Sequence, residues 1–415
     1  MTKNKKHRYM QDVYKPRIIL WGRGFFSQDV YDSLNTNLCE FIGWIDRKVG
    51  ESRIGVEDYF LPEKLDDASY DFIIVTVKKS YGIKEEIERI DSIDRGRVIY
   101  FWEADLRKYY FLIPQVPLYK EEIRLLSFKA ENAPYEAGEI IIPKVKGLVE
   151  TMENLLENGN SLCRFGDAEM RSALKKESQK ECLFQAADTR LQDKLYEVLT
   201  SSDDGIEIGL ADIYGNLDKY IDSEIIFNRT LLCIDDVRKD TMKVLNLERS
   251  FANAFVTRPY WRYRDKSHCK TIFDLWKKIW SGRDVLLVEG EYVRFGMGND
   301  LIGGAKTVRR IICPSKDAFA YYDEILKEAL DQAESGDLIL AALGPTATVL
   351  AYDLAKAGYQ AIDIGQLDME YEWYLRGAED RVSIQGKGVP ELINYEVPYD
   401  AGTEEYIKQI ISIIR

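Results

Sequence analysis

Histidine is nearly absent from this 415-residue chain, which contains only His7 and His268. So few histidines argue against a Ser-His-Asp triad and against a histidine-rich zinc site. The six cysteines show no C-x-x-C spacing, so single buried thiols in a reducing compartment explain them better than disulfides or a zinc cluster. Any bound metal is therefore expected to have oxygen ligands, as Mg²⁺ and Mn²⁺ prefer.

Long apolar runs and excess positive charge are also lacking. No stretch approaches the roughly 18 apolar residues that a membrane span needs, and none follows the basic residues 1–8 as a secretion signal would require. The sequence therefore predicts a cytoplasmic protein without a membrane span, whose basic tail is a solubilising segment or, alternatively, a peripheral membrane contact. A net charge of −13 argues against a nucleic acid partner, because binding phosphates needs a cationic face.

Alternating strand and helix patterns predict an α/β protein with two Rossmann-like parallel-sheet domains. Residues 1–118 are expected to form a small accessory domain, residues 119–145 a helical connector, and residues 146–415 the larger domain. Strands of the larger domain are predicted at 161–165, 206–210, 252–257, 285–288, 310–313, 338–342 and 361–364.

Two carboxylates follow the first of these strands. After Gly166, Asp167 and Glu169 stand two positions apart. In an extended backbone such residues point to the same side, so both would converge beyond the strand end, where open α/β sheets bind ligands. There they suit a divalent cation that bridges diphosphate oxygens. The plain alternative is that Asp167 caps the following helix and Glu169 is a solvated residue in its first turn.

The context of this pair resembles a known family. Residues 164–169, Arg-Phe-Gly-Asp-Ala-Glu, are similar to the R-F-G-D-G-E-type signature of bacterial GT-D fold glycosyltransferases, whose D-x-E pair serves the metal. Segments 288–301, 312–319 and 343–373 also resemble that family, and together they cover roughly residues 145–400 in the right order. The chain departs from the pattern at Ala168, where the family usually has glycine, and at Gln366, where it tends to have histidine.

The resemblance implies a GT-D-type fold for residues 146–415 and a nucleotide-sugar donor, expected to be a UDP-sugar. Asp167 and Glu169 would hold Mn²⁺ or Mg²⁺ against its diphosphate. On physical grounds, the glycine turn at 296–298 and the helix start after Gly344 could also approach a phosphate, although a plain loop and a structural cap are the alternatives. The donor-site residues inferred in this way are Arg164, Gly166, Arg294, Gly296, Gly298, Asn299 and Thr346.

An acidic run after the last predicted strand offers candidate bases. Asp368 or Glu370 could accept the proton of an acceptor hydroxyl, and nearby aromatic residues could stack on a sugar. An acidic turn with buried aromatics is the alternative. If the reaction retains the anomeric configuration, no such base is needed.

A second glycine turn, Gly22-Arg23-Gly24, follows the first strand of the accessory domain, and Asp46 ends the next strand. This arrangement supports an alternative function, an NAD(P)-dependent sugar-nucleotide oxidoreductase. A non-enzymatic scaffold for polysaccharide assembly is a third hypothesis. The favoured prediction is a metal-dependent glycosyltransferase that moves a sugar from a nucleotide-sugar to a glycan or glycoprotein acceptor.

Overall fold

The computed structural model describes residues 14–23, 25–46, 59–65, 69–77, 81–101, 116–176, 185–388 and 404–415. The basic residues 1–8, Gly24 and Cys182 therefore lie outside the described residues. The chain divides into two compact units, Met1–Leu126 and Ser127–Arg415.

The first unit contains a four-stranded parallel sheet with the order β2-β1-β3-β4. Alternate residues of β1 face opposite sides, because side chains alternate along a strand. Leu20 packs in one cluster with Val30, and Ile19 packs in the other with Ile87. The elements are β1 (Arg17–Trp21), α1 (Phe25–Asp32), β2 (Glu40–Ile45), β3 (Phe72–Val75), α2 (Tyr81–Arg89) and β4 (Val98–Tyr100).

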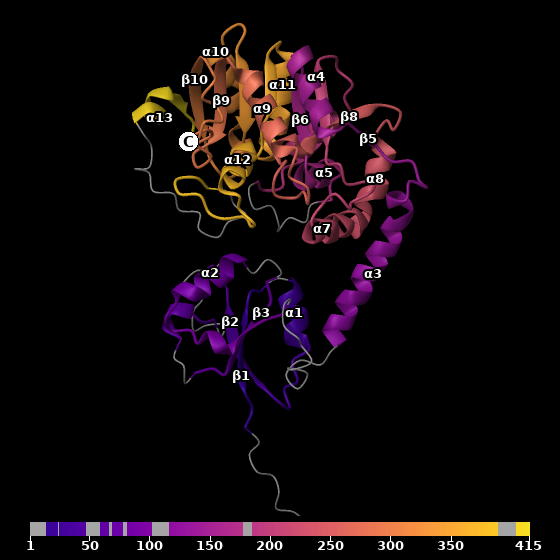
Figure 1. Cartoon of the computed structure of the whole chain (residues 1–415), viewed down its shortest axis with the longest axis vertical. Helices are drawn as coiled ribbons and strands as arrows, with labels where there is room; N and C mark the ends of the chain where they lie inside the picture. Colours follow the sequence, from indigo (N-terminus) through magenta and orange to yellow (C-terminus); the bar gives the residue numbers. More distant parts are fainter. Residues whose placement is uncertain are drawn as a thin grey trace, which may run out of the picture. The chain divides into compact units, whose positions relative to one another are not determined.

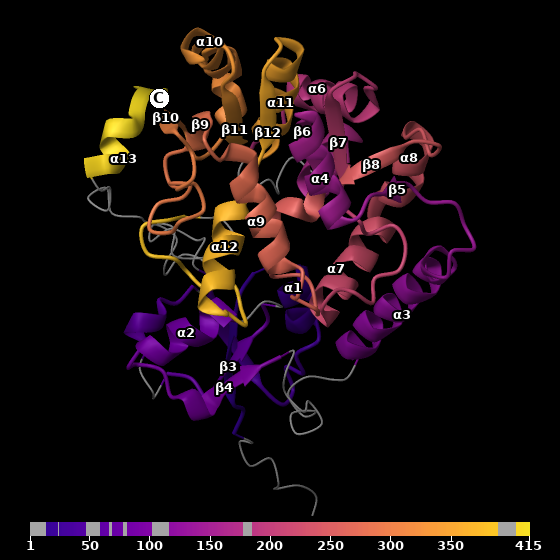
Figure 2. The same cartoon turned by 45° about the horizontal axis from the view of Figure 1, so that its top comes forward.

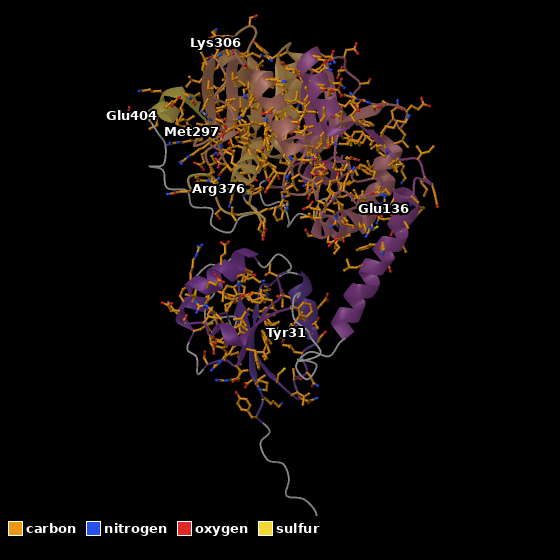
Figure 3. The ribbon with its side chains drawn as sticks, viewed as in Figure 1. Tyr31, Glu136, Met297, Lys306, Arg376 and Glu404 are labelled. Atoms are coloured by element: carbon orange, nitrogen blue, oxygen red, sulfur yellow. The ribbon has the colours of Figure 1, made fainter. Side chains whose placement is uncertain are left out.

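The predicted connector is largely helical. Helix α3 (Val116–Glu136) covers most of it, and the boundary between the two units falls inside this helix, after Leu126. The C-terminal end of α3 belongs to the second unit, where Glu136 accepts hydrogen bonds from Arg229 Nε at 2.8 Å and Nη2 at 2.7 Å. Figure 3 labels Glu136 at this end of α3 and Tyr31 in the first unit.

The second unit is built on a nine-stranded sheet, of which Figure 1 labels β10, β9, β6, β8 and β5. The order of its strands is β13-β10-β9-β11-β12-β6-β7-β8-β5. Every neighbouring pair is parallel. The strands are β5 (Lys144–Val145), β6 (Ser161–Phe165), β7 (Ile206–Leu210), β8 (Ser250–Asn253), β9 (Asp284–Gly290), β10 (Thr307–Cys313), β11 (Leu338–Ala342), β12 (Gln360–Asp363) and β13 (Ile410–Ile413). This arrangement confirms the predicted α/β class with parallel sheets.

Helices cover both faces of this sheet (Figure 2). Leu286 of β9 packs in one cluster with residues of α5, α6, α10 and α11, whereas Leu287 packs in another with residues of α4, α9 and α12. The helices are α4 (Leu148–Asn158), α5 (Asp167–Ala173), α6 (Thr189–Thr200), α7 (Asp222–Cys233), α8 (Val237–Val244), α9 (Cys269–Trp280), α10 (Tyr322–Gln332), α11 (Pro345–Lys356), α12 (Leu367–Arg376) and α13 (Glu404–Gln409).

Of the strands predicted for the larger domain, three match the structure to the residue: β6, β7 and β11. The strand predicted at 252–257 is wrong at its end. It stops at Asn253, whose side chain accepts the Phe255 N–H at 2.9 Å and starts a 3-10 turn over Ala254–Thr257. Among the described residues, no helix combines the length and the hydropathy that a membrane span requires.

Candidate active site

A pocket of about 1480 Å³, including the open solvent at its mouth, lies at the carboxyl ends of the larger sheet. Strands β6 and β12 are neighbours in the middle of the sheet. From β6 the chain runs outward to β7 and β8 on one side, whereas β11, β9, β10 and β13 lie on the side of β12. Ligands of open parallel sheets bind at such a point. The pocket residues at or just after seven neighbouring strand ends are Pro314, Gly290, Ala342, Gly365, Gly166, Ala211 and Ala254.

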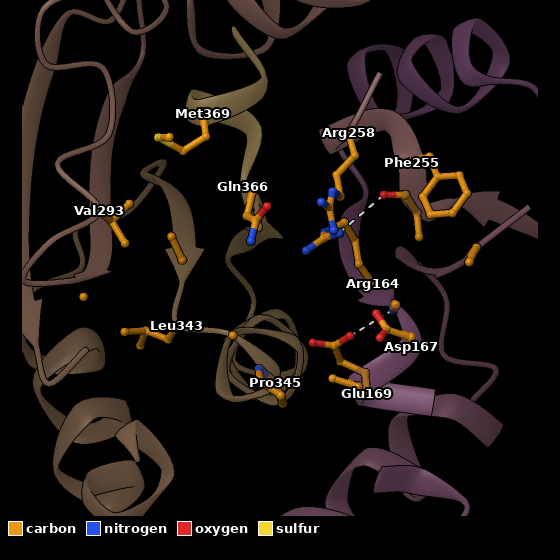
Figure 4. A pocket seen from close by; sticks show the side chains of 18 of the residues that line it. Arg164, Asp167, Glu169, Phe255, Arg258, Val293, Leu343, Pro345, Gln366 and Met369 are labelled. Atoms are coloured by element: carbon orange, nitrogen blue, oxygen red, sulfur yellow. Dashed lines mark hydrogen bonds between the residues drawn. The ribbon is translucent and has the colours of Figure 1, made fainter. Parts of the chain in front are cut away.

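An arginine–aspartate pair connects the two central strands at this pocket. Arg164 of β6 donates from Nε and Nη2 to Asp363 Oδ1 of β12, at 3.3 and 3.1 Å. It also donates from Nη1 to the Ala254 carbonyl at 3.4 Å, and Figure 4 labels Arg164 in the pocket. Asp363 is 1% exposed and also accepts from Thr348 Oγ1 at 3.0 Å. A charge pair with this many bonds holds the guanidinium in one position against the pocket.

Gly365 is shaped to admit that guanidinium. Its φ is +46°, a left-handed conformation that favours glycine, and its N–H donates to Asp363 Oδ1 at 3.0 Å. A Cβ at this position would lie 2.0 Å from Arg164 Nη2. Residue 365 must therefore be glycine for the pair to form.

The expected geometry of the acidic pair is wrong. Asp167 and Glu169 do not stand on extended backbone but in the first turn of α5, which begins directly after Gly166. Glu169 Oε2 accepts the Gly166 N–H at 2.9 Å and so closes a capping box, because a carboxylate at this position satisfies an otherwise unpaired backbone donor. The alternative prediction, that Asp167 caps the helix and Glu169 is solvated, exchanged the two residues. In the structure Glu169 makes the capping hydrogen bond and Asp167 is exposed.

Both carboxylates nevertheless line the pocket, and Figure 4 shows them on the same side of it. Burial raises the pKa of Glu169 to about 7, against the opposing charge of Arg164. The described part of the chain contains no cluster of three or more potential metal ligands. Two carboxylates still fit Mg²⁺ or Mn²⁺, because such ions take one or two protein carboxylates and complete their shell with phosphate oxygens and water.

Asp368 lines the same pocket but is strongly engaged. It is 3% exposed, and it accepts the Gly296 N–H and Asn299 Nδ2 at 2.9 Å each and forms an ion pair with Lys387. These bonds connect the start of α12 to the 296–299 loop. Asp368 therefore has a structural role whatever else it does.

Glu370 lies away from the pocket lining. Its side chain is fully buried, and its Oε2 accepts the N–H groups of Tyr260 and Trp261 at 2.9 and 2.8 Å. Its Oε1 lies 3.6 Å from Arg258 Nε. We therefore assign Glu370 a positioning role, as the anchor of segment 258–261, and not that of a base.

The glycine turn inferred to bind phosphate is closed on itself. Gly296 has a φ of +74°, and its N–H donates to Asp368, so this group is not aimed at a ligand. A Cβ at Gly296 would lie 2.4 Å from Ile302 Cγ2, which explains the glycine by internal packing. Gly298 and Asn299, like Gly296, are not among the residues that line the pocket.

Two other inferred donor-site residues are also absent from the pocket lining. Arg294 is 6% exposed and donates from Nη1 to the Gly386 carbonyl at 3.1 Å. Thr346 is fully buried on α11, with its Oγ1 3.4 Å from Gln185 Oε1. Of the helix start, Gly344 and Pro345 do line the pocket, so the N-terminus of α11 faces it as expected.

Sequence reasoning missed one side of the pocket. Arg258 and Arg262 line it from the segment after β8, and Phe227 and Asn228 line it from α7. The available signal was two arginines four residues apart soon after a predicted strand.

The glycine turn of the first unit is tightly packed. Gly22 has a φ of +104° and donates its N–H to the Ile45 carbonyl at 2.8 Å. A Cβ at this position would lie 2.5 Å from Val77 Cγ2, so only glycine fits. Ser27 Oγ lies 2.6 Å from Thr76 Oγ1. The second glycine of the turn, Gly24, lies outside the described residues.

Comparisons with known proteins agree with this architecture. Residues 162–392 match the model of the glycosyltransferase GT-D fold family. Glycosyltransferase GlyD of Streptococcus pneumoniae is 34% identical over 275 residues, 66% of this chain and 33% of the relative. The probable glycosyl transferase Gly of Streptococcus gordonii is 35% identical over 251 residues, 60% of this chain and 35% of the relative. The chain thus spans about a third of the length of these curated relatives.

Two solved structures are similar as well. The structure described as the highly conserved domain of unknown function 1792 with a distinct glycosyltransferase fold is 32% identical, with a TM-score of 0.62, and covers 69% of this chain and 99% of that one. A glycosyltransferase from Streptococcus sanguinis is 32% identical, with a TM-score of 0.59, and covers 66% of this chain and 100% of that one.

The parallel sheet and the pocket at its carboxyl edge define an α/β protein with a pocket at the strand ends. The matches place it further: the chain belongs to the GT-D fold glycosyltransferases. They support the transferase hypothesis and not the oxidoreductase alternative.

Proposed function

We propose that this protein transfers a sugar from a nucleotide-sugar, specifically a UDP-sugar, to a glycan or glycosylated acceptor, and that Mn²⁺ or Mg²⁺ is required. The observation that carries the proposal is the position of Asp167. It is an exposed carboxylate in the first turn of α5, inside a pocket that also holds Glu169 and the fixed guanidinium of Arg164. Membership in a glycosyltransferase family makes a sugar nucleotide the ligand that this combination of charges suits best.

Transfer breaks the bond between the anomeric carbon and the diphosphate oxygen, and forms a bond from that carbon to an acceptor oxygen. The leaving diphosphate keeps the electron pair, and the acceptor hydroxyl loses its proton. A divalent cation held by Asp167 and Glu169 would supply Lewis-acid neutralisation of the leaving group. Arg164, whose charge is balanced by Asp363, lines the pocket with its guanidinium held in place, and the N-terminus of α11 would add positive potential there.

The proton of the acceptor hydroxyl needs a destination if the configuration inverts. Of the two carboxylates predicted as bases, only Asp368 lines the pocket. The proposal therefore keeps Asp368 alone in this role.

Thermal unfolding of the full chain with Mn²⁺ and UDP tests the donor site. A ligand that binds only the native state raises its melting temperature by mass action, so the parent should be stabilised. Asp167→Ala and Glu169→Ala should lose that shift. Asp222→Ala is the matched control, because Asp222 is also an exposed aspartate that opens a helix, α7, but does not line the pocket.

Turnover then tests the reaction. The parent with Mn²⁺ should release UDP from at least one UDP-sugar, and a chelator should stop the release. If UDP shifts the parent and both acidic variants equally, or if turnover persists in the chelator, the metal role of Asp167 and Glu169 is wrong.

A further inference from the structure

The pocket continues from Arg164 toward α7, where its wall becomes mostly apolar. This part comes from the end of β7, from α7 and from the turn after β8. Its residues, called the α7 wall below, are Ala211, Ile213, Phe227, Asn228, Leu231 and Phe255.

Asn228 is the one polar side chain of the α7 wall. It is 2% exposed, and its amide nitrogen has no hydrogen-bond partner among the described residues. An unpaired amide in an apolar surrounding is costly, and leucine would fill similar space without that cost. An unpaired amide kept on a residue that lines the pocket points to a ligand group that hydrogen bonds to it. A hydroxyl fits either orientation of the amide, since it both donates and accepts.

Phe227 precedes Asn228 on α7 and is 41% exposed at the pocket. An aromatic ring beside an amide suits a saccharide, whose C–H face packs on the ring while a hydroxyl meets the amide. The ring of Phe255, farther along the wall, has Arg262 Cζ 3.9 Å from its centroid.

Three arginines near this wall share two carboxylates. Arg262 Nη1 and Arg381 Nη2 lie 3.1 and 3.2 Å from Glu224, and Arg258 lies 3.6 Å from Glu370. Elsewhere the pocket is lined by the start of α11, at Gly344 and Pro345, and by the carboxylates Asp167 and Glu169 that the proposed function assigns to the metal. The proposed function places the donor diphosphate at Asp167 and Glu169, whereas none of the six residues of the α7 wall is charged, so a neutral group fits that wall.

From this division we propose that the α7 wall binds the acceptor as an uncharged saccharide. Asn228 is the specificity-determining residue that hydrogen bonds one of its hydroxyls, and Phe227 packs against its apolar face. This inference rests on the proposed glycosyltransferase function, and it extends that function by assigning the acceptor site.

The test compares the full-length parent with Asn228→Leu. Ser223→Leu is the control, because it adds a leucine to the same helix at an exposed position that does not line the pocket. The probes are the methyl glycosides of glucose, galactose and N-acetylglucosamine and their monodeoxy derivatives. Saccharide binding is measured by calorimetry without donor, and UDP-sugar hydrolysis is measured without saccharide.

At least one glycoside should bind the parent and Ser223→Leu equally, and Asn228→Leu about tenfold more weakly, the effect of one hydrogen bond. Removing one particular hydroxyl should cost the parent about tenfold and Asn228→Leu nothing, because the two changes delete the same bond. Donor hydrolysis by Ser223→Leu should stay within twofold of that of the parent.

Two results would overturn the inference: no glycoside binds the parent, or Asn228→Leu weakens the donor and leaves saccharide affinity unchanged. A parent that neither binds UDP nor hydrolyses any UDP-sugar refutes the proposed function instead. The donor-free calorimetry distinguishes these cases.

Discussion

Gly365→Ala tests whether the Arg164–Asp363 pair organises the site. The added Cβ would lie 2.0 Å from Arg164 Nη2 and 2.6 Å from Cζ, whereas non-bonded heavy atoms need about 3.5 Å. The guanidinium would have to move by roughly 1.5 Å, which breaks hydrogen bonds that are now 3.1–3.3 Å long.

The expected cost has two parts. An alanine at a φ of +46° costs about 1 kcal/mol relative to glycine. Disrupting a buried ion pair costs about 3–5 kcal/mol when one partner is removed. Asp363 keeps its bond from Thr348, so we expect the lower end of that range. The total of about 4 kcal/mol is a large share of the roughly 5–15 kcal/mol that stabilises a typical protein.

Gly377→Ala provides the matched control. Gly377 ends α12 with a φ of +58°, and a Cβ there would meet nothing within 4 Å, so only the backbone cost of about 1 kcal/mol remains. Urea denaturation of both variants measures the difference, and thermal shift with UDP and Mn²⁺ reports the donor site. We expect Gly365→Ala to lose the shift and Gly377→Ala to keep it.

A double variant isolates the cause. In an Arg164→Ala background the guanidinium is gone, so Gly365→Ala should cost no more than Gly377→Ala. If the two glycine substitutions are equally destabilising in the parent, or if the excess cost survives without Arg164, the assigned role of Gly365 is refuted.

Three further predictions follow from the site. Glu370→Gln should lower the free energy of unfolding in urea by about 1–2 kcal/mol but reduce UDP-sugar turnover less than tenfold, because Glu370 anchors backbone N–H groups outside the pocket. A thousandfold loss of turnover in a folded variant would instead show that Glu370 acts as a base. Gly296→Ala should cost about 2 kcal/mol more than Gly298→Ala, since both have a φ near +75° but only the first Cβ meets a neighbour, Ile302; equal unfolding free energies would contradict this. In the presence of a chelator, the free energy of unfolding should fall as the pH rises from about 4.3 to about 7. These are the pKa of glutamate in the unfolded state and the pKa of Glu169 in the folded state, and between them the folded state holds one more proton. Glu169→Gln should flatten this slope in urea titrations, and an unchanged slope would show that other groups cause it.

The residue patterns of single segments were sufficient to predict much of the fold. Strands β6, β7 and β11 were predicted to the residue because each is a short, buried apolar run between turn signals, and burial on both faces is typical of parallel strands. Strands β5 and β13 were missed because they are short edge strands, and nothing within two or four residues distinguishes them from a loop.

The acidic pair shows where local argument fails. The sequence located Asp167 and Glu169 at the strand end, and both do line the pocket. Their geometry depends on whether the backbone continues extended or turns into a helix. The Glu169–Gly166 capping bond and the packing of α5 on α6 and α11 favour the helix. That packing cannot be predicted from the residues of the segment alone, because it depends on the positions of the other two helices.

Identity of residue types and their order along the chain thus determined the class, the family resemblance and the edge of the sheet where the pocket lies. Only the tertiary structure decided which carboxylates face the pocket and which serve the scaffold. Arg164 meets Asp363 across 199 positions, and Glu370 meets Tyr260 across 110. Such contacts depend on how the strands are ordered in the sheet, and no periodicity of a single segment encodes that order.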